Sequence, residues 1–128
     1  MAIAVRTLLV IDDVEDNCVL LKHRLEKKGY KVEIALDGQE GFLVLARKAI
    51  DLILLDLDMP VMNGFTFLEK LLTEQKHAHI PVIITSSLDD PDTKSDCMTY
   101  GARGFVAKPC DMKKLFSMIN DCLATDTA

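Results

Sequence analysis

Residues 51–58 read Asp-Leu-Ile-Leu-Leu-Asp-Leu-Asp, a continuous apolar run that ends at the carboxylate of Asp56. Four consecutive apolar residues between charged ones are typical of a short strand that is covered on both faces. Similar runs occur at residues 8–11 (Leu-Leu-Val-Ile) and 82–85 (Val-Ile-Ile-Thr). Strands buried on both faces predict a parallel sheet between two layers of helices.

Two further runs complete the predicted sheet. Residues 105–107 form a weaker apolar run, and residues 31–35 (Lys-Val-Glu-Ile-Ala) alternate polar and apolar side chains, which suits an edge strand. Segments with helical spacing of apolar residues separate the runs, for example residues 14–25 and 42–49. Because right-handed crossovers join parallel strands, this order predicts an α/β fold with five strands and five helices.

The predicted helices are bounded by capping residues. Asp90-Pro91 and Asp111 are typical helix starts, since Asp caps free backbone N–H groups and proline suits the first helical position. Gly29 and Gly101 follow predicted helices as stop signals. The apolar face of the first helix is predicted to contain Val14, Cys18, Leu21 and Leu25.

The composition limits the class of protein. The 128 residues suit a single domain, with a core expected at about residues 6–123 and a short flexible C-terminal tail. The net charge of −5 argues against a nucleic-acid-binding face. There is no apolar run near the roughly 18 residues of a membrane helix and no basic secretory leader, so we expect a cytoplasmic protein without membrane contact.

Cysteines and histidines give no sign of a metal or disulfide framework. Neither set shows the close pairing of a zinc site, and free thiols in a reducing compartment are expected. The residues concerned are Cys18, Cys97, Cys110 and Cys122, and His23, His77 and His79.

Carboxylates gather at the ends of two predicted strands. Asp12 and Asp13 follow the first strand, and Asp56 follows the third, with Asp58 two residues further on. Reactive groups of open parallel sheets lie at the carboxyl ends of the strands. Two unit charges about 4 Å apart repel by roughly 4 kcal/mol at an effective dielectric near 20, so the cluster calls for a cation. Mg²⁺, which prefers oxygen ligands, is the natural candidate.

Two other strand ends carry groups suited to phosphoryl transfer. Ser86 ends the fourth strand with a hydroxyl, and Lys108 ends the fifth strand before Pro109. An ammonium group there could neutralise a phosphoryl oxygen as a point charge. A serine at a strand end is more often a helix cap and a lysine more often a solvated residue, but here every strand end on one crevice carries a functional group.

With these motifs the sequence resembles the receiver domain of two-component response regulators, the family of the chemotaxis response regulator. The resemblance covers nearly the whole chain. It implies a flavodoxin-like, doubly wound (βα)5 three-layer sandwich with strand order 2-1-3-4-5. The matching segments are Leu9-Val-Ile-Asp12-Asp13, Asp51-Leu-Ile-Leu-Leu-Asp56-Leu-Asp-Met-Pro60-Val-Met-Asn-Gly64, Pro81-Val-Ile-Ile-Thr-Ser86 and Gly101-Ala-Arg-Gly-Phe105-Val-Ala-Lys108-Pro109.

The resemblance implies a metal site and a phosphoacceptor. Asp56 would accept a phosphoryl group from a histidine kinase or a histidine phosphotransfer protein. Asp13, Asp56 and the backbone carbonyl of Asp58 would ligate Mg²⁺, for which Mn²⁺ is expected to substitute, and Asp12 would act through a water molecule. Because many receivers carry another residue at the position of Asp58, we expect this carboxylate to change the lifetime of the phosphorylated state.

The resemblance also implies a switch. Lys108 and Ser86 would hold the phosphoryl oxygens, and Phe105 would swing inward when Ser86 moves. The Lys108–Pro109 bond is expected to be cis. Readout would occur on the surface of the fourth helix, fifth strand and fifth helix, toward a downstream protein or a fused output domain. Such a protein is not an enzyme beyond its own phosphotransfer and autodephosphorylation.

Two alternatives remain open at this stage. The Asp56-Leu-Asp58 motif also resembles the nucleophile motif of haloacid-dehalogenase-type phosphatases, but that reading leaves the Asp12-Asp13 pair unexplained. A pseudo-receiver used only for binding would have no reason to keep the clustered carboxylates. The sequence does not identify the kinase, the output or the oligomeric state, nor whether the chain acts alone or belongs to a larger protein.

Overall fold

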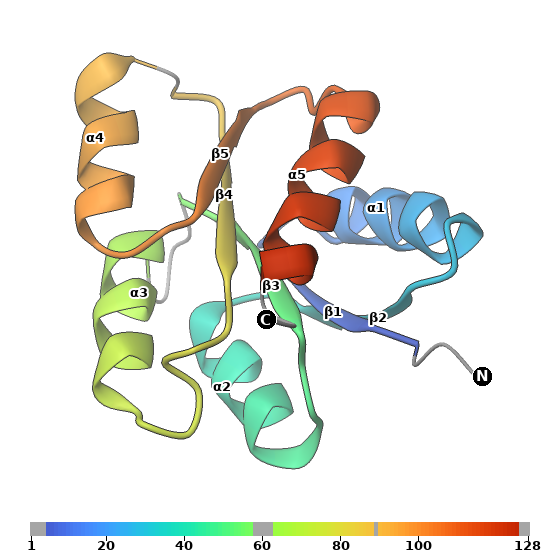
Figure 1. Cartoon of the computed structure of the whole chain (residues 1–128), viewed down its shortest axis with the longest axis horizontal. Helices are drawn as coiled ribbons and strands as arrows, with labels where there is room; N and C mark the ends of the chain where they lie inside the picture. The colour runs from blue at the N-terminus through green and yellow to red at the C-terminus, as the bar shows by residue number, and fades with distance from the viewer. Residues whose placement is uncertain (1–4, 58–62, 89, 126–128) are drawn as a thin grey trace.

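The computed structural model describes residues 5–57, 63–88 and 90–125 as a single sheet with helices on both faces (Figure 1). Asp58 lies outside these residues. In chain order the elements are β1 (Thr7–Ile11), α1 (Glu15–Lys27), β2 (Lys31–Ala35), α2 (Gly38–Arg47), β3 (Leu52–Asp56), α3 (Gly64–Thr73), β4 (Val82–Ser86), α4 (Pro91–Thr99), β5 (Gly104–Ala107) and α5 (Met112–Thr125).

The five strands are parallel and lie in the order β2-β1-β3-β4-β5, as the resemblance implied. The strand with alternating side chains, β2, lies at one edge, as predicted. The three continuous apolar runs form the inner strands β1, β3 and β4, where all five positions of β3 and β4 are buried. Burial on both faces explains why these strands lack a polar alternation.

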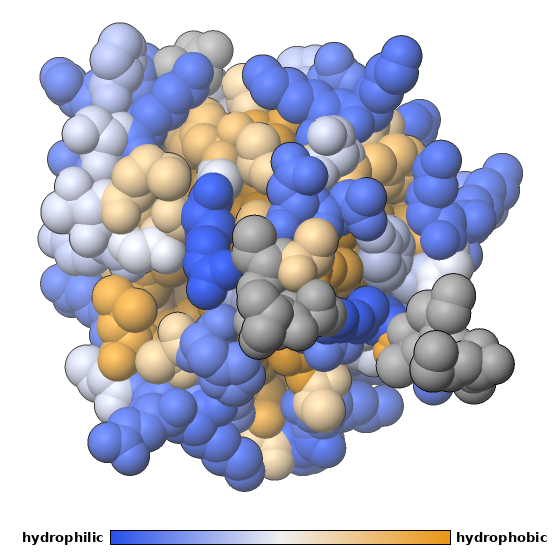
Figure 2. Space-filling view, in the orientation of Figure 1, coloured by the Kyte–Doolittle hydropathy of each residue, from blue (hydrophilic) through white to orange (hydrophobic). Residues whose placement is uncertain are grey.

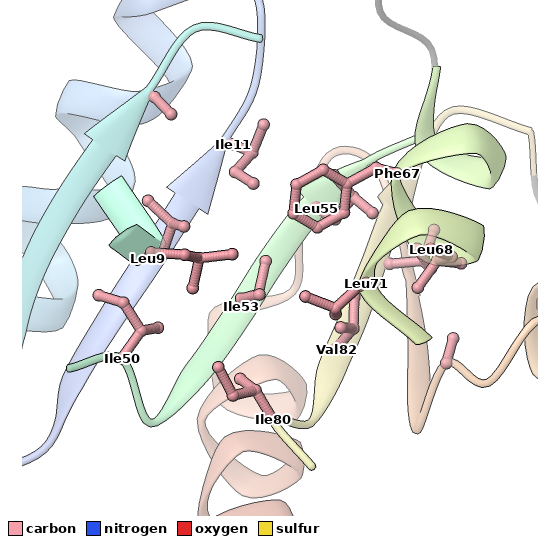
Figure 3. Packing of buried hydrophobic residues seen from close by; sticks show 14 of the residues in the cluster. Leu9, Ile11, Ile50, Ile53, Leu55, Phe67, Leu68, Leu71, Ile80 and Val82 are labelled. Carbon is pink, nitrogen blue, oxygen red and sulfur yellow. The ribbon is translucent and has the colours of Figure 1, made fainter. Parts of the chain in front are cut away.

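One half of the core lies between the sheet and helices α2, α3 and α4. Alternate residues of the inner strands point to this side, among them Leu9, Ile53 and Leu55. Figure 3 shows the side chains of α3, including Phe67 and Leu71, pointing toward those strand residues. Successive residues of a strand face opposite sides of the sheet, so the intervening residues of the same strands form the second half of the core on the other face.

That other half packs helices α1 and α5 on the opposite face. Leu8, Val10 and Leu54 point to this side and meet buried residues of α1 and α5, among them Leu25 and Leu115. The two layers together bury the inner strands β3 and β4 along their whole length, whereas the edge strands β2 and β5 keep partly exposed positions. On the face drawn in Figure 2, hydrophilic residues fill much of the periphery, with separate apolar patches between them.

Two helix boundaries differ from the sequence prediction. Val14 is the N-cap of α1 with an extended backbone and is 47% exposed, so it does not belong to the buried face. Helix α2 ends at Arg47, which leaves Ala49 outside the helix. Asp90 caps α4 as predicted, accepting a hydrogen bond from the Thr93 backbone. Among the described helices, none has the length and apolar character needed to cross a membrane.

The register aligns the strand ends that carry polar groups. Asp56, the last residue of β3, pairs with Thr85 of β4, and Ser86 pairs with Ala107 of β5. Asp12 follows directly after β1, which pairs with β3. Because parallel strands end at one edge, the sheet brings these groups together there.

Candidate functional site

Three carboxylates converge at the carboxyl edge of the sheet. Asp12, Asp13 and Asp56 each offer an oxygen, and these oxygens lie within 4.8 Å of one another. Asp12 is 2% and Asp56 5% exposed, whereas Asp13 is exposed to solvent. Two of the three charges are therefore removed from water, and their mutual repulsion is only weakly screened.

The ammonium group of Lys108 bridges the two buried carboxylates. Its Nζ lies 3.0 Å from Oδ2 of Asp12 and 3.2 Å from Oδ1 of Asp56. Burial by itself lowers the pKa of Lys108, but the hydrogen bond to Asp12 and the charges of Asp56 and Asp12 outweigh burial and raise it. Lys108 therefore stays positively charged at neutral pH and offsets part of the charge of the cluster.

The donor set fits a hard divalent cation. Carboxylate oxygens are the ligands that Mg²⁺ prefers in proteins, and it binds through one or two of them together with water and phosphate oxygens. One ammonium group compensates one of the three negative charges, so the site retains negative charge for a cation. The exposed position of Asp13 leaves the cluster open to solvent on that side.

The end of β4 and the end of β5 are joined by their backbones. The Lys108 backbone N–H donates to the carbonyl of Ser86 at 2.8 Å, which fixes the start of the lysine side chain beside β4. Ser86 is fully buried, and its hydroxyl oxygen accepts a hydrogen bond from the Leu88 backbone N–H at 3.0 Å. The Lys108–Pro109 peptide bond is cis, as expected.

Phe105 lies on β5, where it pairs with Ile84 of β4. Its half-buried ring packs against the core under α4, and the Nζ of Lys94 lies 5.7 Å from the ring centroid. This distance is within the range of a cation–π contact. The Phe105 ring thus contacts both the core and the Lys94 side chain of α4.

Two contacts to Asp12 were not predicted from the sequence. The Asn17 side chain donates to Oδ2 of Asp12 at 3.4 Å, and the Cys18 thiol donates to the Asp12 carbonyl at 3.3 Å. Burial, together with the charge of Asp12, raises the pKa of Cys18 to about 12, so the thiol keeps its proton. The signal was their place in the first turns of the helix that directly follows Asp12 and Asp13.

A cavity of about 520 Å³ opens beside this site. Its polar lining residues are Asp12, Thr85 and Lys108 at the strand ends and Asn17 and Arg24 of α1. Its other lining residues are Leu20, Leu21, Pro109, Cys110 and Met112.

The fold and this edge define a doubly wound α/β protein with an acidic, lysine-bridged site at its strand ends. Residues 8–120 match the response regulator receiver domain family, and the chain belongs to that family. The chain is 38% identical over 112 residues to the response regulator PleD of Caulobacter vibrioides, covering 88% of this chain and 25% of PleD. It is 33% identical over 117 residues to protein PilH of Pseudomonas aeruginosa, covering 91% of this chain and 97% of PilH.

A solved structure confirms the fold assignment. The chemotaxis protein CheY4 of Vibrio cholerae superposes with a TM-score of 0.88 at 28% identity, covering 94% of this chain and all of that chain. Family membership supports a phosphorylation-dependent signalling role, and the receiver domain family is regulatory rather than a family of classical enzymes. Receiver domains of this family interact with histidine kinases and output domains.

One expectation about partners is not supported by these relatives. The chain is 32% identical over 116 residues to a regulator from Synechocystis that is named as DNA-binding, and it spans 48% of that protein. It likewise spans about a quarter of the length of PleD. The negative charge of this domain therefore does not argue against nucleic-acid binding by a protein that contains it.

Proposed function

We propose that Asp56 is the phosphoacceptor of a two-component phosphorelay. The observation that carries this proposal is the placement of Asp56 at the end of a central strand, with Lys108 at 3.2 Å and two further carboxylates around it. An oxygen of Asp56 attacks the phosphorus, and the bond from phosphorus to the donor histidine nitrogen breaks. The imidazole keeps that electron pair and takes up a proton.

Asp13 and Asp56 would hold Mg²⁺ directly, with Asp12 in its outer shell. The proposed carbonyl ligand of Asp58 lies outside the described residues. When bound, the ion supplies charge neutralisation of the phosphoryl oxygens, which is the main requirement of phosphoryl transfer. Mn²⁺ has similar oxygen preferences and is expected to substitute.

Lys108 and Ser86 would recognise the modified side chain. Phosphorylation converts one carboxylate charge into a group of higher charge with additional acceptor oxygens. The Lys108 ammonium then contacts a phosphoryl oxygen in place of the Asp56 carboxylate. The Ser86 hydroxyl gives up its hydrogen bond from the Leu88 backbone and donates to a second phosphoryl oxygen. Contacts that exist only after modification can shift a conformational equilibrium.

Phe105 would carry this shift to the surface. Movement of Ser86 opens space next to β5, and the ring of Phe105 turns inward away from Lys94. The surface formed by α4, β5 and α5 then changes shape toward a downstream protein or an attached output domain. Autodephosphorylation returns the domain to the starting state, and no other turnover is expected.

The test is covalent modification by a small phosphodonor. Incubation with acetyl phosphate and Mg²⁺ should add the mass of one phosphoryl group, and peptide mapping should place it on Asp56. Asp56→Asn should add none, and neither should the wild-type protein in EDTA. Absence of modification in the wild type with Mg²⁺ would instead support a pseudo-receiver that acts only by binding. Steady hydrolysis of a generic phosphomonoester would favour a phosphatase.

A further inference from the structure

Asp12 has an asymmetric set of donors. Its Oδ1 accepts the Val14 backbone N–H at 2.9 Å, whereas its Oδ2 accepts both Lys108 at 3.0 Å and Asn17 at 3.4 Å. We propose that Asn17 is a positioning residue, which holds Asp12 in the orientation that the metal site requires. This inference rests on the proposed function, because it concerns the same site.

The role of Asn17 follows from the two carboxylates that share Lys108. The ammonium group is shared between Asp12 and Asp56, and a phosphoryl group on Asp56 draws it toward the new oxygens. Oδ2 of the buried Asp12 then loses its charged donor. A buried acceptor without a donor is costly, and Asn17 is the neutral donor that remains on that oxygen.

The first turns of α1 hold Asp12 at two points. Beside the Asn17 amide on the carboxylate, the neighbouring Cys18 thiol donates to the Asp12 carbonyl and is itself fully buried. Backbone and side chain of Asp12 are thus both fixed by α1. Partners that orient a metal's carboxylate shell affect metal affinity without touching the ion.

The position is not explained by helix stability. Asn has a lower intrinsic helix propensity than Ala, Glu or Lys, so helix propensity gives no reason for an amide at this position. The preceding residues Glu15 and Asp16 are exposed carboxylates that suit the positive end of the helix dipole. Asn17 instead is half-buried and lines the cavity beside Asp12.

The experiment is titration of the unphosphorylated protein with MgCl₂ by calorimetry. Asn17→Ala is expected to raise the Kd for Mg²⁺ about 10-fold, the lower end of the range for removal of an outer-shell partner. The matched control is Asn120→Ala, which removes an exposed amide from α5 and should leave the Kd unchanged. Thermal unfolding in EDTA should show that Asn17→Ala is folded, since alanine favours the helix.

A second readout separates positioning from a structural role. With acetyl phosphate at subsaturating Mg²⁺, Asn17→Ala should be phosphorylated more slowly than the wild type, and saturating Mg²⁺ should restore most of the rate. An unchanged Kd in Asn17→Ala would overturn the role of Asn17 while leaving the phosphoacceptor intact. Failure of the wild type to bind Mg²⁺ would overturn the proposed metal site as well.

Discussion

The ammonium nitrogen of Lys108 lies 3.2 Å from Oδ1 of Asp56. The same nitrogen contacts Asp12, which lies 96 positions earlier in the chain. One cation at the end of β5 therefore stabilises two buried anions at the ends of β1 and β3. The unphosphorylated domain is held together at this edge by the group that we propose to recognise the phosphoryl oxygens.

Replacement of Lys108 should impair both chemistry and stability. Lys108→Met is expected to slow phosphorylation by acetyl phosphate about 100-fold, as is typical when a charge-stabilising group is removed. In EDTA it should also lower the free energy of unfolding by at least about 1 kcal/mol, because two buried carboxylates lose the cation that they share. The rate of phosphorylation is measured by mass spectrometry of the intact protein, and the free energy of unfolding is measured by urea denaturation. Lys113→Met, at an exposed lysine of α5, is the control, and equal rates in the two variants would contradict the role of Lys108.

Removal of the Asp13 carboxylate should raise the stability of the protein without metal but weaken its stabilisation by Mg²⁺. Asp13→Asn is expected to raise the free energy of unfolding in EDTA by up to about 1 kcal/mol, since it relieves repulsion at an exposed position. Excess Mg²⁺, which adds about 2.7 kcal/mol at 100 times its Kd, should stabilise the wild type but hardly the variant. Asp16→Asn, three residues further along, is the control for loss of an acidic residue. Equal stabilisation of Asp13→Asn and wild type by Mg²⁺ would exclude Asp13 as a ligand.

The Cys18 thiol should make the folded protein less stable as the pH rises above 9. Its pKa is raised to about 12 in the folded protein from 9.0, so the unfolded chain loses this proton first as the pH rises. The folded state should therefore lose up to about 1.4 kcal/mol per pH unit above pH 9 from this thiol alone. Urea unfolding between pH 8 and about 10.5 should show a shallower decline in Cys18→Ala than in the wild type. Parallel declines would show that the thiol does not contribute.

Two glycines should differ in their tolerance of a side chain. A Cβ on Gly64 would lie 2.8 Å from the Cα of Leu57, the residue directly after Asp56, and backbone cannot move away easily. Gly64→Ala should therefore lose about 1–3 kcal/mol of stability. A Cβ on Gly41 would lie 2.6 Å from the end of the Ile11 side chain, which can rotate. Urea unfolding should show a smaller loss for Gly41→Ala, and a reversed order would contradict this packing argument.

The sheet could be predicted because its signals are local and redundant. Continuous apolar runs fixed β1, β3 and β4, and the alternation at residues 31–35 identified β2 as an edge strand. Apolar periodicity did not locate the ends of helices. Val14 fits the period of α1, but its N–H is bound by the Asp12 carboxylate, which places it before the first turn.

The site was predictable only where it depends on strand ends. Asp12, Asp13, Asp56 and Lys108 meet because parallel strands deliver their last residues to one edge. The contact from Asn17 depends on the rotation of α1 over the sheet, which no polar pattern in the sequence specifies. Nor does the sequence reveal that the Phe105 ring lies beneath Lys94, since that contact joins a helix surface to a strand.

The span of the Lys108–Asp12 contact has a consequence for synthesis of the protein. Asp12 leaves the ribosome 96 positions before Lys108, the lysine that neutralises it and that follows the last strand of the sheet. Until β5 is made, the nascent chain carries the acidic cluster without this counter-cation, and a compact intermediate would bear the full repulsion. Assembly of the sheet edge is therefore favoured only once nearly the whole domain has been translated, unless a divalent cation takes the place of Lys108.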